Sequence, residues 1–183
     1  MWRRAVVLLV AIVALGLGGV AQAVTLPPLP GAPPQEPPPA REQPPQEQHP
    51  PLPADSGSGR RIVYSVPQQR VWLVEGDDRV IDSWLVSGRR GIPKPGTYSI
   101  FSRSRWTTSN GGKVRMEFML RFVRTTGQAI GFHAIPIDRR GRPIQSESEL
   151  GQPRSRGCVR QARSDAEHLW NWAPNGTTVR VTG

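Results

Sequence analysis

The sequence predicts a mostly β domain that occupies residues 60–183 and contains one α-helix. Short runs rich in Val, Ile, Trp and Tyr alternate with Gly- and Pro-containing turns, and only one segment has a helical period. The domain boundary follows from composition, since 13 of the 20 prolines fall between Pro27 and Pro53. Such a segment cannot bury enough apolar surface to offset the entropy lost on ordering. We therefore expect residues 24–59 to form a Pro-rich disordered tether.

Six strands are expected before the helix and one after it. Gly76-Asp77-Asp78 is a tight-turn sequence, and it predicts that the second and third strands form a hairpin. A loop rich in Gly and Pro, residues 87–96, leads into the fourth strand. The expected strands are 61–65, 70–75, 80–86, 97–102, 116–123, 129–135 and 177–181.

The expected helix starts immediately after the loop that contains Cys158. Ser164 and Glu167 match a capping box, with Ser at the N-cap and Glu three residues later. Pro174-Asn175-Gly176 is expected to end the helix. Its apolar face would be formed by Ala166, Leu169, Trp170 and Ala173.

The first 23 residues have the pattern of an export signal. A basic start, Trp2-Arg3-Arg4, precedes an apolar run over residues 5–20, and Ala21-Gln22-Ala23 supplies a small-x-small cleavage pattern. The alternative is an uncleaved N-terminal anchor. Either interpretation places the domain outside the cytoplasmic membrane, in the cell wall compartment, and we expect cleavage.

The domain is strongly basic. From Arg60 onward there are 21 Lys and Arg residues against 10 Asp and Glu residues. This balance favours an anionic partner. An exported domain seldom meets nucleic acid, so anionic cell-wall polymers fit better.

Cys158 is the only cysteine of the chain, which excludes an intramolecular disulfide. It lies in a Gly-containing loop, where a rigid frame can hold a reactive side chain exposed. A thiol needs a neighbouring base to act as a nucleophile near neutral pH, and imidazole is the usual one. His49 lies in the tether and His168 on the polar side of the helix, so His133, in an apolar strand, is the expected partner.

The segment around these two residues resembles the active-site signature of the bacterial L,D-transpeptidases. In that family a histidine, here His133, precedes a Ser-His-Gly-Cys motif, here Ser155-Arg156-Gly157-Cys158, by about two dozen residues. Residues 68–73 and the turn at 87–98 also resemble the family, so the resemblance covers essentially the whole of residues 60–183.

The resemblance implies a β-sandwich-like catalytic domain that cross-links peptidoglycan. Cys158 would attack the stem tetrapeptide at its third residue, release D-Ala and pass the acyl group to an amine, which forms 3-3 cross-links. His133 would take the thiol proton, oriented by the backbone carbonyl of Ala134. Backbone N–H groups around Gly157 and Cys158 would stabilise the oxyanion.

Ser155 and Arg160 would shape the loop or hold a substrate carboxylate, to which Arg donates two parallel hydrogen bonds. Arg156 departs from the family pattern because histidine is usual there, and a permanently charged Arg cannot be a base. If only hydrogen-bond donation matters, Arg156 substitutes, and its charge is expected to favour the thiolate. Two alternatives remain open: an L,D-carboxypeptidase, in which the same acyl-enzyme passes to water instead of an amine, and a weak or inactive cell-wall-binding module because of Arg156.

The remaining expectations concern ligands and assembly. No set of His, Cys and carboxylate residues has metal-ligand spacing, so no metal site is expected. The family requires no cofactor. The resemblance makes peptidoglycan stem peptides the expected partners and carbapenem-type β-lactams the expected inhibitors, acting on Cys158, and we expect a monomer.

Overall fold

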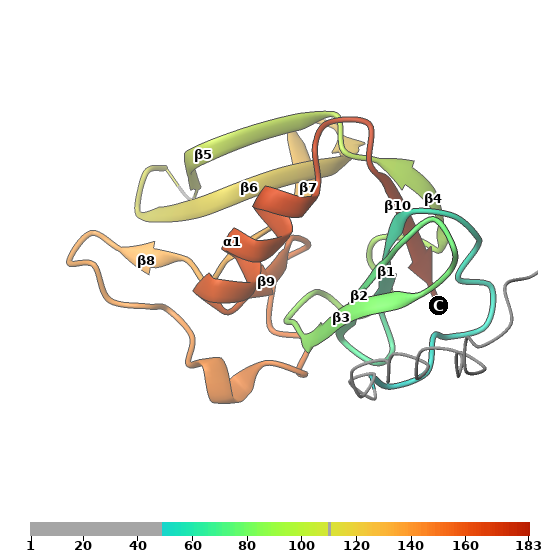
Figure 1. Ribbon diagram of the computed structural model, residues 1–183. Coiled ribbons are helices and arrows are strands. Elements are labelled where there is room, and N and C mark those ends of the chain that lie inside the picture. Colours follow the sequence, from blue (N-terminus) through green and yellow to red (C-terminus); the bar gives the residue numbers. More distant parts are fainter. Residues whose placement is uncertain (1–48, 110) are drawn as a thin grey trace, which may run out of the picture. The chain divides into compact units, whose positions relative to one another are not determined.

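The computed structural model describes residues 49–109 and 111–183 (Figure 1). The expected signal segment, 1–23, and the tether up to residue 48 lie outside the described residues. The last part of the expected tether lies against the domain: Trp72 Nε1 donates to the carbonyl oxygen of Pro50 at 2.8 Å, and Leu52 packs on Trp72. Within the described ranges, no helix is long and apolar enough to cross a membrane.

The first sheet contains five strands in the order β3-β2-β1-β10-β4. β1 pairs with β10 in parallel, and the other pairs are antiparallel. The central strands β1 and β2 are buried on both faces, because Val63, Trp72 and Val74 form a second apolar cluster, against which Leu52 and Val80 pack. These strands are β1 (Arg61–Ser65), β2 (Arg70–Val74), β3 (Val80–Leu85), β4 (Gly96–Ser99) and β10 (Thr178–Thr182).

The second sheet has the order β5-β6-β7-β9, and a short strand, β8, also pairs with β6. The main core lies between the two sheets, where Phe122 and Phe132 stack with ring centroids 4.6 Å apart and Tyr64 meets Phe132 edge-on. The strands of this sheet are β5 (Ser102–Ser109), β6 (Val114–Thr125), β7 (Gln128–Ala134), β8 (Ile137–Asp138) and β9 (Val159–Gln161).

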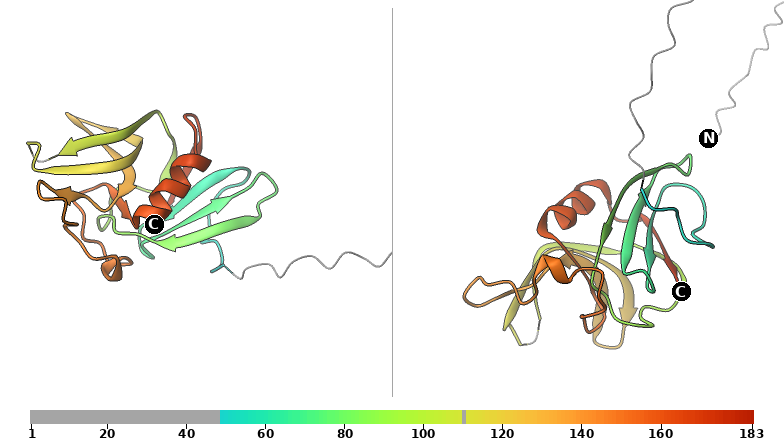
Figure 2. Two further views of the ribbon diagram at one scale, coloured as in Figure 1. Left: turned by 60° about the vertical axis from the view of Figure 1, so that its left-hand side comes forward. Right: turned by 90° about the horizontal axis from the view of Figure 1, so that it is seen from below.

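The helix α1 (Arg163–Trp172) lies at the junction of the two sheets (Figure 2). Its apolar face is the expected one, since Ala166 and Leu169 are buried in the core. The predicted capping box is wrong. Because β9 leads directly into the helix, the N-cap is Ala162 without a side-chain cap, and Ser164 falls inside the first turn. A capping box does form around the 3₁₀ turn η1 (Glu147–Glu149), between the side chains of Ser146 and Glu149.

The predicted fold class is confirmed. The part of the chain that the structure describes is mostly strands in two sheets, with one α-helix after the Cys158 loop. The predicted hairpin is also present, since β2 pairs antiparallel with β3 and Asp78 adopts a positive φ of 63° in the turn. The sequence did not predict β5, β8 or β9. β5 is polar and largely exposed, while β8 and β9 have only two and three residues.

Candidate active site

His133 is the penultimate residue of β7, and 2% of its surface is exposed. Its Nδ1 atom lies 2.7 Å from the carbonyl oxygen of Ala134. A carbonyl oxygen only accepts hydrogen bonds, so Nδ1 carries the ring proton and Nε2 is the free acceptor. Burial lowers the pKa of His133 to about 4; the bond to Ala134 opposes this shift, and the charge of Arg160 adds to it. The imidazole is therefore neutral near pH 7.

Cys158 lies immediately before β9, beside the strand that carries His133. The parallel register pairs His133 with Arg160 and Phe132 with Val159. Side chains two residues apart point to the same face of a sheet. Cys158 and Arg160 therefore face the side that His133 faces, and all three line one pocket of about 610 Å³.

Cys158 is half-buried, and its Sγ lies 3.7 Å from the carbonyl oxygen of Ala129. Burial raises the pKa of Cys158, while the nearby backbone of Gly131 and the charges of Arg121 and Arg160 oppose the shift. The thiol is therefore protonated at neutral pH in the absence of substrate.

Arg160 is held in place by two residues that the sequence did not identify. Its Nη1 donates to Gln145 Oε1 at 2.9 Å, and Gln145 Nε2 donates to Ser87 Oγ at 2.7 Å. The backbones of Ser87 and Arg160 also exchange hydrogen bonds of 2.8 and 2.9 Å. Ser87 begins the turn at 87–98 that resembles the family, but nothing in the sequence connects it to Arg160, and no periodicity or motif marks Gln145.

The loop before the cysteine is fixed by backbone contacts. Ser155 N–H donates to the carbonyl oxygen of Gly88 at 2.9 Å. Ser155 Oγ accepts a hydrogen bond from Gly157 N–H at 3.0 Å. The expected oxyanion donor at Gly157 is therefore occupied by Ser155 in this structure. A Cβ atom at Gly88 would overlap the hydroxyl of Tyr64, so this close approach needs glycine.

The pocket is basic. Arg89, Arg156 and Arg160 line it, and among the described residues that line it none is Asp or Glu. Arg156 is exposed, and its backbone carbonyl accepts from Arg89 Nη1 at 3.3 Å. Burial lowers the pKa of Arg160, and the charge of Arg156 adds to this effect. The charges of Arg121 and Arg160 act to lower the pKa of the Cys158 thiol.

Arg121 is a further residue that the sequence did not identify. Its guanidinium donates to Ser104 Oγ at 2.9 Å and to Ser102 Oγ and Thr107 Oγ1 at 3.3 Å each. β5, which carries these three hydroxyl groups, was not predicted, so nothing in the sequence linked Arg121 to Cys158.

The other two histidines lie elsewhere. His168 is on the exposed side of α1, with its Nε2 3.3 Å from Asp82 Oδ2. His49 is the first described residue and does not line the pocket. Within residues 49–109 and 111–183, no group of three or more His, Cys, Asp or Glu side chains is placed to hold a metal ion.

The fold of the described residues, two sheets and one α-helix, agrees with comparisons against known proteins. The family model of the L,D-transpeptidase catalytic domain (YkuD) matches residues 59–181. The chain therefore belongs to the L,D-transpeptidase catalytic domain family. The matched range contains every residue predicted for the site.

Individual relatives are distant. The Bacillus subtilis (strain 168) protein named "Putative L,D-transpeptidase YciB" is 26% identical over 124 residues, which cover 64% of this chain and 63% of that protein. The L,D-transpeptidase of Xylanimonas cellulosilytica DSM 15894 aligns with a TM-score of 0.55 and 22% identity, over 73% of this chain and 65% of that one. The L,D-transpeptidase LdtMt1, solved in complex with imipenem, aligns with a TM-score of 0.55 and 13% identity, over 69% and 60%. These structural similarities show the fold.

Proposed function

We propose that this protein is a peptidoglycan L,D-transpeptidase in which Cys158 is the nucleophile and His133 the base. The observation that carries the proposal is the shared pocket: neighbouring parallel strands bring the thiol and a neutral imidazole to the same face, with Nε2 free. The substrate would be a stem tetrapeptide, attacked at the carbonyl of its third residue. We also propose export through residues 1–23, because this polymer lies outside the cytoplasmic membrane.

The protonation states support a concerted attack. The thiol is protonated and the imidazole neutral before substrate binds. As Sγ bonds to the carbonyl carbon, the thiol proton passes to His133 Nε2. The C–N bond to D-Ala then breaks, and Nε2 returns the proton to the leaving amine. The acceptor amine then attacks the thioester carbonyl and gives a proton to Nε2, and the C–S bond breaks as Nε2 passes that proton to the departing sulfur, which restores the thiol and completes a 3-3 cross-link.

The oxyanion donors would be rearranged by substrate. Gly157 N–H is bound to Ser155 Oγ, so it becomes available to the oxyanion when the serine hydroxyl rotates away. The N–H of Cys158 itself is the second expected donor. One donor in a comparable site contributes about 3–4 kcal/mol to transition-state stabilisation.

The arginines of the pocket suit the carboxylates of a stem peptide. Arg156 and Arg160 line the same pocket as Cys158, and Gln145 fixes Arg160. An Arg fork donates two parallel hydrogen bonds to a carboxylate. Arg156 in place of histidine therefore adds a carboxylate-binding group beside the reaction centre. The basic surface also suits anionic wall polymers, and a carbapenem would acylate Cys158 through its strained carbonyl.

Hydrolysis of the same acyl-enzyme is the second candidate function. The side chain of Cys158 is partly exposed in an open pocket, so water has access to a thioester formed there. The protein would then be an L,D-carboxypeptidase. The choice between the two depends on whether an amine or water reaches the thioester first.

A test of the proposal uses the full chain, a disaccharide-tetrapeptide and mass spectrometry, with Cys158→Ala as control. We expect cross-linked dimers that lack one D-Ala, formed by the wild type alone. Disaccharide-tripeptide monomers would assign the carboxypeptidase activity. Unchanged substrate would refute both and leave a wall-binding module.

A further inference from the structure

A second pocket lies on the opposite face of the sheet from Cys158. On β6, Met116 lines the catalytic pocket, whereas its neighbours Arg115 and Glu117 line the second one. On β7 the same alternation separates His133 from Ala134. Adjacent residues of a strand point to opposite faces, so the two pockets are back to back. The second pocket has a volume of about 1140 Å³.

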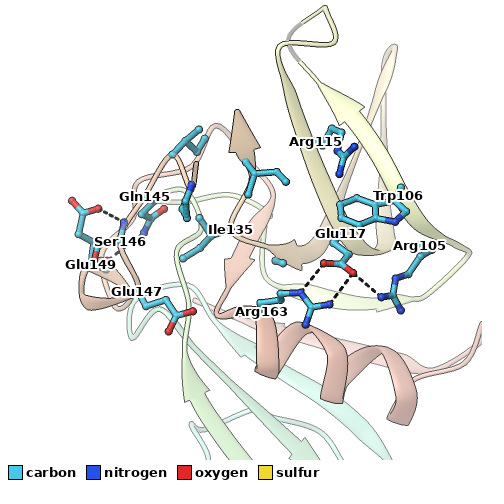
Figure 3. A pocket seen from close by; sticks show the side chains of 14 residues that line it. Arg105, Trp106, Arg115, Glu117, Ile135, Gln145, Ser146, Glu147, Glu149 and Arg163 are labelled. Carbon is cyan, nitrogen blue, oxygen red and sulfur yellow. Dashed lines mark hydrogen bonds and ion pairs between the residues drawn. The ribbon is translucent and has the colours of Figure 1, made fainter. Parts of the chain in front are cut away.

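One rim of this pocket is basic and is built around a buried carboxylate (Figure 3). Glu117 accepts from Arg163 Nε at 2.9 Å and Nη2 at 3.1 Å, and Arg105 Nη2 lies 2.7 Å from Glu117 Oε1. Arg163 is also paired with Glu167, at 3.3 Å, so these two arginines and two carboxylates balance in charge. Arg115 adds a further positive charge, and its guanidinium lies over the exposed ring of Trp106, 4.5 Å from the centroid.

The opposite rim is acidic. Glu147 and Glu149 belong to the turn η1, which Figure 3 shows facing the arginines across the pocket. Glu149 is engaged by Arg154 at 2.8 Å, whereas Glu147 is exposed. Among the described residues, neither Glu147 nor Arg115 forms an ion pair. Trp106 belongs to the basic rim, and further apolar side chains line the pocket: Ile135, Ile137, Pro143 and Ile144.

A ligand that matches this surface carries a carboxylate at one end, an amine at the other and an apolar stretch between them. A free amino acid is too small for such a volume, since pockets of ~300–1,000 Å³ accommodate drug-sized ligands. If the proposed function is correct, the domain works on a polymer of that chemistry. A stem tetrapeptide ends in a carboxylate, and an acceptor stem must also carry a free amine.

We propose that the second pocket binds a non-reacting stem peptide of the same polymer and so anchors the enzyme on the wall. The inference rests on the proposed function for the identity of the peptide. A stem held there cannot reach Cys158, because the β6–β7 layer separates the pockets. Ile144 lines both pockets, so one multi-stem strand can wrap around this edge and occupy both.

The pocket also touches the supports of the catalytic pair. Ala134, whose carbonyl orients His133, lines it, and so does Gln145, which holds Arg160. Binding in the second pocket is therefore expected to affect His133 and Arg160 on the catalytic face. The direct measurement is nevertheless of binding, because binding does not require turnover.

The test is an NMR titration of the full chain carrying Cys158→Ala with the disaccharide-tetrapeptide. Trp106→Phe identifies the indole N–H resonance of Trp106, which should shift in a saturable way. Arg115→Glu should weaken the affinity measured at Trp106 by about tenfold, through repulsion of the carboxylate. Acetylating the amine of the peptide should weaken it as well. Glu147→Gln should abolish the difference between free and acetylated peptide.

Arg124→Glu is the matched control. Arg124 is exposed and stacks on Phe101 at 3.8 Å, as Arg115 stacks on Trp106, but it lines neither pocket. It should leave the titration unchanged. The inference is overturned if Trp106 does not shift, if the disaccharide alone gives the same shift, or if Arg115→Glu behaves as Arg124→Glu does.

The two proposals fail separately. If the peptide binds saturably at Trp106 but the wild type forms no product, the proposed anchoring site stands and the proposed transpeptidase activity is refuted. Cross-linked product without a response at Trp106 would refute the anchoring site alone.

Discussion

The buried imidazole of His133 makes a quantitative prediction for the pH dependence of acylation. The reaction needs the neutral ring, and burial lowers the pKa of His133 to about 4. At pH 5.5 such a ring is about 97% neutral, whereas an exposed histidine of pKa ~6.5 would be about 9% neutral. Lowering the pH from 7.5 to 5.5 should therefore change the acylation rate constant by less than about 10%. The rate should halve only near pH 4.

The assay should isolate acylation, since an acceptor amine titrates too. Imipenem supplies an acyl group and needs no acceptor amine. The opening of its β-lactam ring is monitored through the accompanying loss of absorbance, under subsaturating conditions. Blanks without enzyme correct for hydrolysis of the drug at each pH. His133→Asn should be acylated slowly at every pH. A tenfold loss of rate between pH 7.5 and 5.5 in the wild type would refute the assignment of the buried imidazole as the base.

Three further predictions follow from single contacts. Arg156→His should raise KM for the tetrapeptide or change the ratio of cross-linked to hydrolysed product. Identical kinetics of the two forms would show that having Arg rather than His at this position has no effect on the reaction. Gln145→Ala should release Arg160 and raise KM by about fivefold to tenfold, as for the net loss of one ordinary hydrogen bond of ~1–1.4 kcal/mol, with kcat nearly unchanged; a fall in kcat alone would contradict this. Gly88→Ala should lower the free energy of unfolding in urea by ~1–3 kcal/mol through overlap with the Tyr64 hydroxyl, and Tyr64→Phe should recover part of it.

The strands that form the core could be predicted from the sequence because their pattern is local. Each run of β-branched and aromatic residues predicted its strand to within a few residues, and the apolar face of α1 was predicted as well. The cap was not. The start of α1 is set by the pairing of β9 with β7, which brings the chain into the helix at Ala162 and leaves Ser164 inside it.

The candidate site was predictable only in its chemistry-bearing residues. Cys158 and His133 stand out as the single cysteine and the one histidine in an apolar strand. Their meeting depends on a three-residue parallel strand, β9, which is too short to leave a pattern. The residues that support them, Gln145 and Ser87, are polar residues of loops whose role exists only through contacts 58 residues apart in the sequence.

The second pocket left no signal in the sequence. Arg105 and Arg115 of its basic rim lie on β5 and β6. β5 is a polar segment without the apolar alternation that predicts a strand. Glu117 is the one charged residue in an otherwise apolar part of β6, and it is buried because two arginines neutralise it. Arg163, which supplies one of these charges, comes from α1, 46 residues further along the chain.

Covalent capture of the stem peptide tests the central claim most directly. The full chain is mixed with the disaccharide-tetrapeptide and the reaction is quenched in acid within seconds. Mass spectrometry gives the mass of the intact protein, and peptide mapping then locates the adduct. The account predicts an added mass equal to the disaccharide-tetrapeptide minus D-Ala, carried by Cys158 and absent from Cys158→Ala. An unmodified chain that nevertheless forms product, or an adduct on another residue, would contradict it.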